Sequence, residues 1–66
     1  MRFVIYTADH EPPHAHVYGV GEARIDIVEL SVITQGAMSD RDVRRALVVI
    51  EENQTLFLET WRKYHG

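Results

Sequence analysis

Cysteine is absent from this 66-residue sequence, and only two residues are proline and four are glycine. Without cysteine, no disulfide can stabilise the chain. A chain of this length has room for one domain, residues 1–66, and such a domain buries only about 60 % of its unfolded surface. A structural metal, a partner subunit or unusually regular packing are the remaining sources of stability for so small a core.

Long hydrophobic runs are also missing. No apolar run approaches the roughly 18 residues that a membrane span needs, and no basic region followed by an apolar core begins the sequence. We therefore expect neither a membrane span nor a signal peptide. Together with the absence of cysteine, this pattern predicts a cytoplasmic protein.

The sequence has no excess of positive charge. Seven lysines and arginines stand against ten acidic residues, which gives a formal net charge of −3. This sign argues against a nucleic-acid partner for the isolated chain, because such binding depends on neutralising phosphates. The 45 % hydrophobic and 26 % charged residues are close to ordinary averages and predict a folded domain.

The distribution of β-branched, aromatic and alternating residues predicts the fold class. Alternation of apolar and polar residues is typical of half-buried strands, whereas the Asp-His-Glu-Pro-Pro run must interrupt the sheet. The sequence predicts an α+β domain with a small antiparallel sheet of three to four strands, followed by one long C-terminal helix packed on one face. The strands are expected at about 2–7, 14–19, 23–29 and 30–34, and the helix at about 40–64.

The helix is expected to begin after Ser39, whose side chain suits the N-cap position. Apolar residues then recur at spacings of three, four and seven through Trp61. The stretch 53–55, Asn-Gln-Thr, contains poorer helix formers than its flanks and is where a kink is most expected. Further apolar residues widen the apolar arc beyond one face, which predicts an interface: Val48, Val49, Leu56 and Leu58.

Strand alternation also assigns residues to the two sheet faces. If the apolar residues of the second and third strands face the helix, the polar residues of the same strands face away. The inward set is then Ala15, Val17, Ile25 and Ile27, and the outward set includes His14, His16, Tyr18, Arg24 and Asp26.

The densest group of reactive side chains is the segment 9–16, Asp-His-Glu-Pro-Pro-His-Ala-His. His14 and His16 lie two apart on a strand, with Cβ atoms roughly 6–7 Å apart, so both can bind one divalent metal such as zinc. His10 or Asp9 would supply a third ligand from the loop. An open coordination position would then hold a polarised water, as in hydrolytic zinc sites.

Two other interpretations of this segment stay open. In a structural role, Asp9 and His10 hydrogen-bond the turn, while His14 and His16 hydrogen-bond across the sheet. In metal-free catalysis, one histidine is the general base and another the general acid, with His10, His14 and His16 as candidates. The candidate binding residues are Asp9, His10, His14, His16, Tyr18, Arg24 and Asp26.

The string Asp-His-Glu-Pro-Pro-His-Ala-His-Val-Tyr at 9–18 resembles the family called domain of unknown function 4160. Its members carry an Asp-His-x-Pro-Pro-His-x-His pattern and a C-terminal helix with a Leu-x-x-Trp element, which here matches 58–61. Two departures are Ala15, where members have an aromatic residue, and the Ser-Asp-Arg-Asp stretch, where members often carry Leu-Pro.

The resemblance implies a small bacterial protein of no assigned activity, from gene arrangements that look like toxin–antitoxin pairs. We therefore expect an interaction or regulatory module, acting as a homo-oligomer or with a small partner protein, in which the histidine-rich loop is a binding or structural site. The alternative is a metal-dependent hydrolase or nuclease that uses the histidine cluster.

Overall fold

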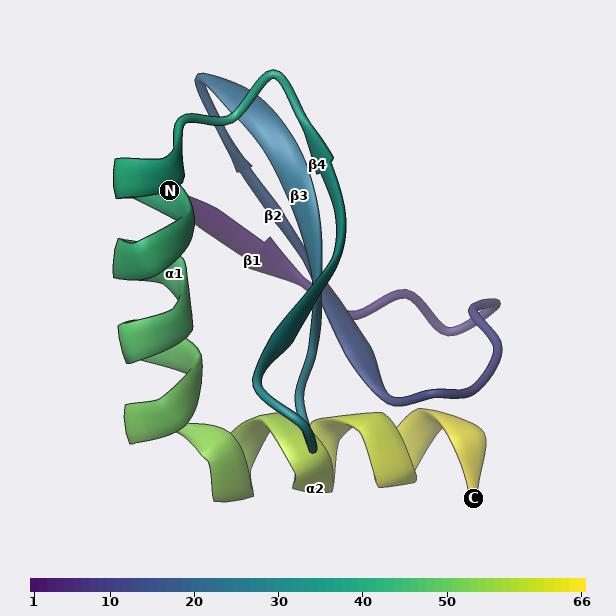
Figure 1. Ribbon diagram of the computed structural model, residues 1–66. Helices are drawn as coiled ribbons and strands as arrows, with labels where there is room; N and C mark the ends of the chain where they lie inside the picture. The colour runs from purple at the N-terminus through teal and green to yellow at the C-terminus, as the bar shows by residue number, and fades with distance from the viewer.

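The computed structural model describes residues 1–66 as a four-stranded antiparallel sheet followed by two helices (Figure 1). The strands lie side by side in chain order, β1-β2-β3-β4, so that each strand pairs with the next. The predicted α+β class is confirmed. The elements are β1 Arg2–Val4, β2 His14–Gly19, β3 Gly21–Asp26, β4 Ser31–Gly36, α1 Asp40–Glu52 and α2 Gln54–His65.

The bounds of β2 agree with the sequence prediction, whereas those of β3 differ. β3 begins at Gly21 and ends at Asp26 rather than spanning 23–29. The Asp26 side chain explains this end, because its Oδ1 accepts hydrogen bonds from the backbone N–H groups of Val28 and Glu29, each at 2.8 Å. A short aspartate side chain that bonds the following backbone favours a turn, so the chain leaves the sheet although the alternation continues.

The two edge strands also differ from the prediction. β1 ends at Val4 rather than at residue 7, since its pairing with β2 stops at the Val4–His16 pair. β4 runs over 31–36 rather than 30–34, because Leu30 has a left-handed backbone (φ 55°) and belongs to the preceding turn. The bounds of both edge strands are therefore set by pairing and by the adjoining turns, which β-propensity alone does not predict.

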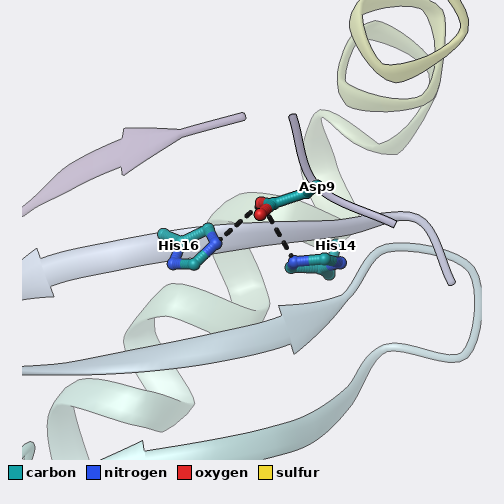
Figure 2. Close-up of side chains that lie close together, drawn as sticks. All are labelled: Asp9, His14 and His16. Atoms are coloured by element: carbon teal, nitrogen blue, oxygen red, sulfur yellow. Dashed lines mark hydrogen bonds and ion pairs between the residues drawn. The ribbon is translucent and has the colours of Figure 1, made fainter. Parts of the chain in front are cut away.

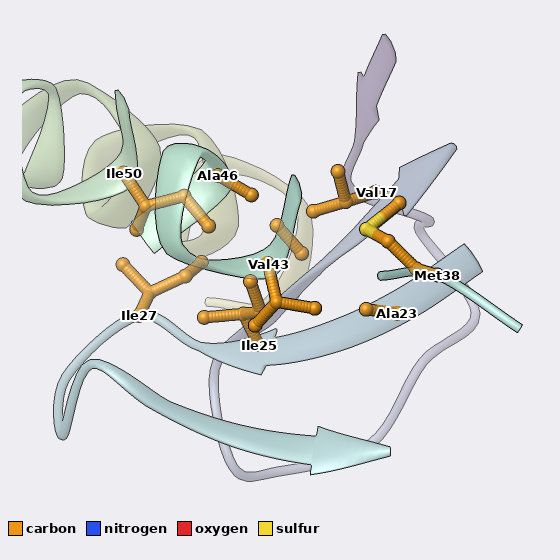
Figure 3. Close-up of a cluster of buried hydrophobic side chains, with 9 residues drawn as sticks. Val17, Ala23, Ile25, Ile27, Met38, Val43, Ala46 and Ile50 are labelled. Carbon is orange, nitrogen blue, oxygen red and sulfur yellow. The ribbon is translucent and has the colours of Figure 1, made fainter. Parts of the chain in front are cut away.

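The hydrophobic core lies between one face of the sheet and α1 (Figure 3). The predicted inward residues of β2 and β3 are buried there, as is Ile27 just beyond β3, and α1 contributes three buried side chains at helical spacing. Ser39 caps α1 as predicted, since its Oγ accepts the backbone N–H of Asp42 at 3.1 Å. The core comprises Ala15, Val17, Ala23, Ile25, Ile27, Met38, Val43, Ala46 and Ile50.

The prediction of one long helix is wrong, because the helix ends at Glu52 and a second one begins at Gln54. Asn53 lies at the break and bonds back to the first helix, where its side-chain Nδ2 and its backbone N–H both donate to the Val49 carbonyl. A straight helix of 25 residues would be about 38 Å long, roughly twice the length of a six-residue strand. The break instead turns α2 across the end of the sheet.

α2 packs beneath the β3–β4 turn (Figure 1), to which Gln54 ties it by donating to the Ile27 carbonyl at 2.8 Å. Phe57 then packs on Phe3, with ring centroids 5.8 Å apart, and Trp61 packs on His14. Of the residues that widened the predicted apolar arc, Leu58 is half-buried against the core. The other three remain exposed: Val48, Val49 and Leu56.

Candidate metal centre

Three of the candidate ligands converge at the start of β2 (Figure 2). His14 and His16 project from the strand, and Asp9 reaches them from the loop before it. One ligand atom from each residue lies within 4.8 Å of the other two. The geometry is thus that of a single small site formed by alternate residues of a strand and a neighbouring loop.

His14 is the most constrained of the three. Its Nδ1 lies 2.7 Å from the Pro12 carbonyl oxygen, which can only accept, so the proton of a neutral ring is on Nδ1 and the lone pair is on Nε2. Nε2 is buried, makes no hydrogen bond, and lies 3.1 Å from Asp9 Oδ2. The His14 side chain is only 8 % exposed. Trp61 packs on it, with ring centroids 5.4 Å apart.

His16 approaches the same carboxylate oxygen. Its Nε2 donates to Asp9 Oδ2 at 2.8 Å, and the ring is half-buried. The Tyr6 ring packs against it in a T-shaped arrangement at a centroid separation of 4.7 Å, and the Tyr18 ring lies nearly parallel to it at 6.3 Å. One oxygen therefore faces two imidazole nitrogens, and aromatic rings restrict the motion of both.

This ligand set suits a divalent transition metal. Imidazole and carboxylate are common ligands of zinc, and a histidine ligand usually donates its other ring N–H to a carbonyl or carboxylate, as His14 does to Pro12. Ligand atoms around a tetrahedral zinc are about 3.4 Å apart. Here the two nitrogen–oxygen distances are 3.1 and 2.8 Å and all three ligand atoms lie within 4.8 Å of one another, so the side chains would have to rearrange to admit the ion. Three protein ligands leave one coordination position open.

The other predicted site residues lie outside this cluster. His10 is exposed in the loop and does not join the three ligands. Asp26 was expected on the solvent-facing side of the sheet, but it is buried, and its carboxylate serves the turn after β3. His14 was also expected to face solvent and is instead covered by Trp61 and the loop. Tyr18 and Arg24 do lie on the sheet face opposite α1, which we call the open face.

Tyr18 provides a neutral hydroxyl on the open face. Its hydroxyl shares a hydrogen bond with that of Tyr6 at 2.8 Å. This bond, with smaller contributions from desolvation and from the neighbouring Tyr6 and Glu22 charges, raises the pKa of Tyr18 above its ordinary value. The group therefore stays protonated around neutral pH and acts as a donor or acceptor rather than as a base.

Sequence reasoning did not assign three groups that shape the site. The Pro12 carbonyl orients His14, Tyr6 packs on His16, and Trp61 covers His14. A backbone carbonyl carries no signal in residue type, and Trp61 is remote from the motif in sequence. The one sequence signal for any of them is the alternation along residues 2–7, which places Tyr6 on the same side of the predicted strand as Arg2.

Fold and cluster together define a small α+β protein with a two-histidine, one-carboxylate site at the start of a strand. The chain belongs to the family described as Domain of unknown function (DUF4160), whose model matches residues 1–62. Comparison with curated proteins found no match, and neither did comparison with solved structures. Neither helix combines the length and apolar character that crossing a membrane requires.

Proposed function

We propose that this protein binds one divalent transition-metal ion, zinc in the first instance, through Asp9, His14 and His16. The observation that carries the proposal is the Nε2 atom of His14, which is buried, has no hydrogen-bond partner and lies beside a carboxylate oxygen. In a neutral ring this places a lone pair 3.1 Å from another electron-rich atom. A positive charge between them removes the repulsion.

A bound ion accounts for the cluster better than a proton does. A proton shared by His14 and Asp9 would satisfy that pair only, and the hydrogen bond from His16 to Asp9 would be a separate interaction. A metal ion uses both imidazole nitrogens and the shared oxygen at once. It would also fasten the loop before β2 to the sheet, which supplies stability that a 66-residue core lacks.

The open coordination position is consistent with the alternative function, that of a metal-dependent hydrolase or nuclease. A water on a zinc ion with three protein ligands has a pKa of about 7 and can act as a nucleophile. His14 and His16, with Asp9, would hold the ion, whereas His10 lies outside the three-residue cluster. His10 stays a candidate for general acid–base catalysis from the loop.

Zinc titration of the purified protein tests the proposal. We expect one ion per chain by calorimetry, with a parallel change in the emission of Trp61, the only tryptophan, because it packs on His14. His16→Ala and Asp9→Ala should each weaken binding at least about 100-fold, since loss of even outer-shell partners costs about 10–100-fold.

His10→Ala is the matched control, because it removes an exposed histidine from the same loop. It should bind zinc like the wild type, and circular dichroism should show all variants folded. His16→Ala is preferred to His14→Ala as the main test, because His14 is buried. Absence of stoichiometric zinc binding, or an equal loss in His10→Ala, would contradict the proposal.

A second candidate role is self-association through β4, the interaction module that the family resemblance implies. All six residues of this edge strand are exposed, and none is charged or proline. Natural edge strands are usually protected by such residues, so an uncharged edge is suited to pairing. A second copy is the occupant that fits, because antiparallel pairing of β4 with itself places no like charges opposite one another.

Sedimentation at micromolar concentration tests this second candidate. We expect a dimer, and Ile33→Lys should return the protein to a monomer because lysine on an edge strand opposes pairing. Val48→Lys, at an exposed apolar position of α1, is the control and should leave the dimer intact. A wild-type mass near 7.6 kDa would contradict the proposal.

Membership of a toxin–antitoxin-like gene pair stays a prediction, which the identity of the neighbouring genes would test.

A further inference from the structure

The open face carries a hollow directly beside the proposed metal centre. Its lining includes His16, Tyr18, Glu22, Arg24, Thr34 and Gln35. Arg24 is the cross-strand partner of His16, so their side chains leave the sheet about 5 Å apart on the same face. A ligand on the ion that His16 holds would therefore lie within reach of Arg24.

Arg24 is held in place without being neutralised. Its Nε donates to Thr34 Oγ1 at 3.1 Å, which positions the guanidinium through a neutral partner. No carboxylate pairs with it, although Glu22 lies on the same hollow, since the ion pairs of the protein are formed by other residues. Its terminal amino groups are thus available to a ligand.

A second arginine on this face also forms no ion pair with a carboxylate. Arg2 lies over the ring of Tyr18, with its guanidinium carbon 5.1 Å from the ring centroid. The face therefore has two unneutralised guanidinium groups in a protein whose net charge is −3. Guanidinium groups bind planar arrays of oxygen atoms such as those of phosphate and carboxylate.

We propose, resting on the proposed function, that the hollow binds a terminal phosphate group, one oxygen of which occupies the open position of the metal while others accept from Arg24. Charge favours phosphate over carboxylate. A divalent ion with the Asp9 carboxylate leaves one positive charge, Arg24 and Arg2 add two, and the Glu22 carboxylate on the hollow removes one. The two positive charges that remain are those that a phosphate dianion balances. An extended polyanion fits less well, because the rest of the chain is acidic.

Calorimetric titration of the zinc-loaded protein with inorganic phosphate tests this inference. We expect saturable binding that is at least about tenfold weaker in Arg24→Gln, because a charge-assisted hydrogen bond is lost. Arg44→Gln removes the same charge from an exposed position on α1 and should bind phosphate like the wild type. Zinc affinity, measured separately, should be unchanged in both variants.

The outcomes separate this inference from the proposed function. If zinc binds and phosphate does not, the inference is wrong and the metal site stands. Equal phosphate affinity with and without zinc would overturn coordination by the metal. An equal loss in Arg24→Gln and Arg44→Gln would overturn the assignment of Arg24. Failure of zinc to bind would remove both proposals.

Discussion

Replacing Trp61 by alanine is expected to remove a large part of the protein's unfolding free energy at room temperature. Trp61 is 3 % exposed, although it lies outside the main core; its ring stacks on His65 at a centroid distance of 3.7 Å and packs at a tilt against His14 at 5.4 Å. Truncating a buried tryptophan costs about 3–5 kcal/mol. A domain of 66 residues has only about 3–10 kcal/mol of unfolding free energy to lose.

Urea denaturation followed by far-UV circular dichroism measures this loss, because the variant has no tryptophan to report by fluorescence. Tyr64→Ala is the control, since it truncates an aromatic residue of the same helix that is 47 % exposed. It should cost less than about 1 kcal/mol. Equal losses in the two variants would show that α2 is not held to the sheet through Trp61.

Gly21→Ala is expected to destabilise the protein by about 3 kcal/mol or more. Gly21 has a left-handed backbone, with φ of 86°, which alanine adopts only at a cost. A Cβ atom there would lie 2.4 Å from the backbone carbon of Ala37 and from the nitrogen of Met38. Because both are backbone atoms, the connection into α1 would have to move.

Gly19→Ala is the matched control, at the other side of the same hairpin. A Cβ atom at Gly19 would meet only the side-chain atoms Met1 Cγ and Met38 Cε, at 3.7 and 3.8 Å, which is ordinary contact. Thermal unfolding should show a markedly lower midpoint for Gly21→Ala and little change for Gly19→Ala. Similar midpoints in both would mean that the approach of residues 37 and 38 to this hairpin does not constrain the fold.

The fold was largely predictable because its signals are local. Alternation along 23–27 placed Ile25 and Ile27 on the covered side, and Ser39 capped α1 as its position indicated. The sequence predicted a kink at 53–55, but it did not predict that the chain would turn there into a second helix. The direction of that turn depends on the bond from Gln54 to the Ile27 carbonyl, a contact between residues 27 positions apart that no local pattern encodes.

The candidate site was only partly predictable. The spacing of His14 and His16 on a strand placed them together, but it did not choose between Asp9 and His10 as the third group. The path of the loop made that choice, by directing Asp9 to the strand and leaving His10 exposed. The role of Asp26 was likewise decided by the turn that follows it, whose N–H groups its carboxylate accepts.

The sequence by itself determined the α+β class, the apolar residues that line the covered face of the sheet, and the placement of two histidines side by side on one strand. These follow from periodicity and from residues at most a few positions apart. The tertiary structure alone decided that His14 is buried beneath Trp61, 47 positions away, with one ring nitrogen bonded to Pro12 and the other facing Asp9 without a hydrogen bond. Packing of distant segments removes water from that nitrogen, and this desolvation is what makes the cluster suited to a metal ion.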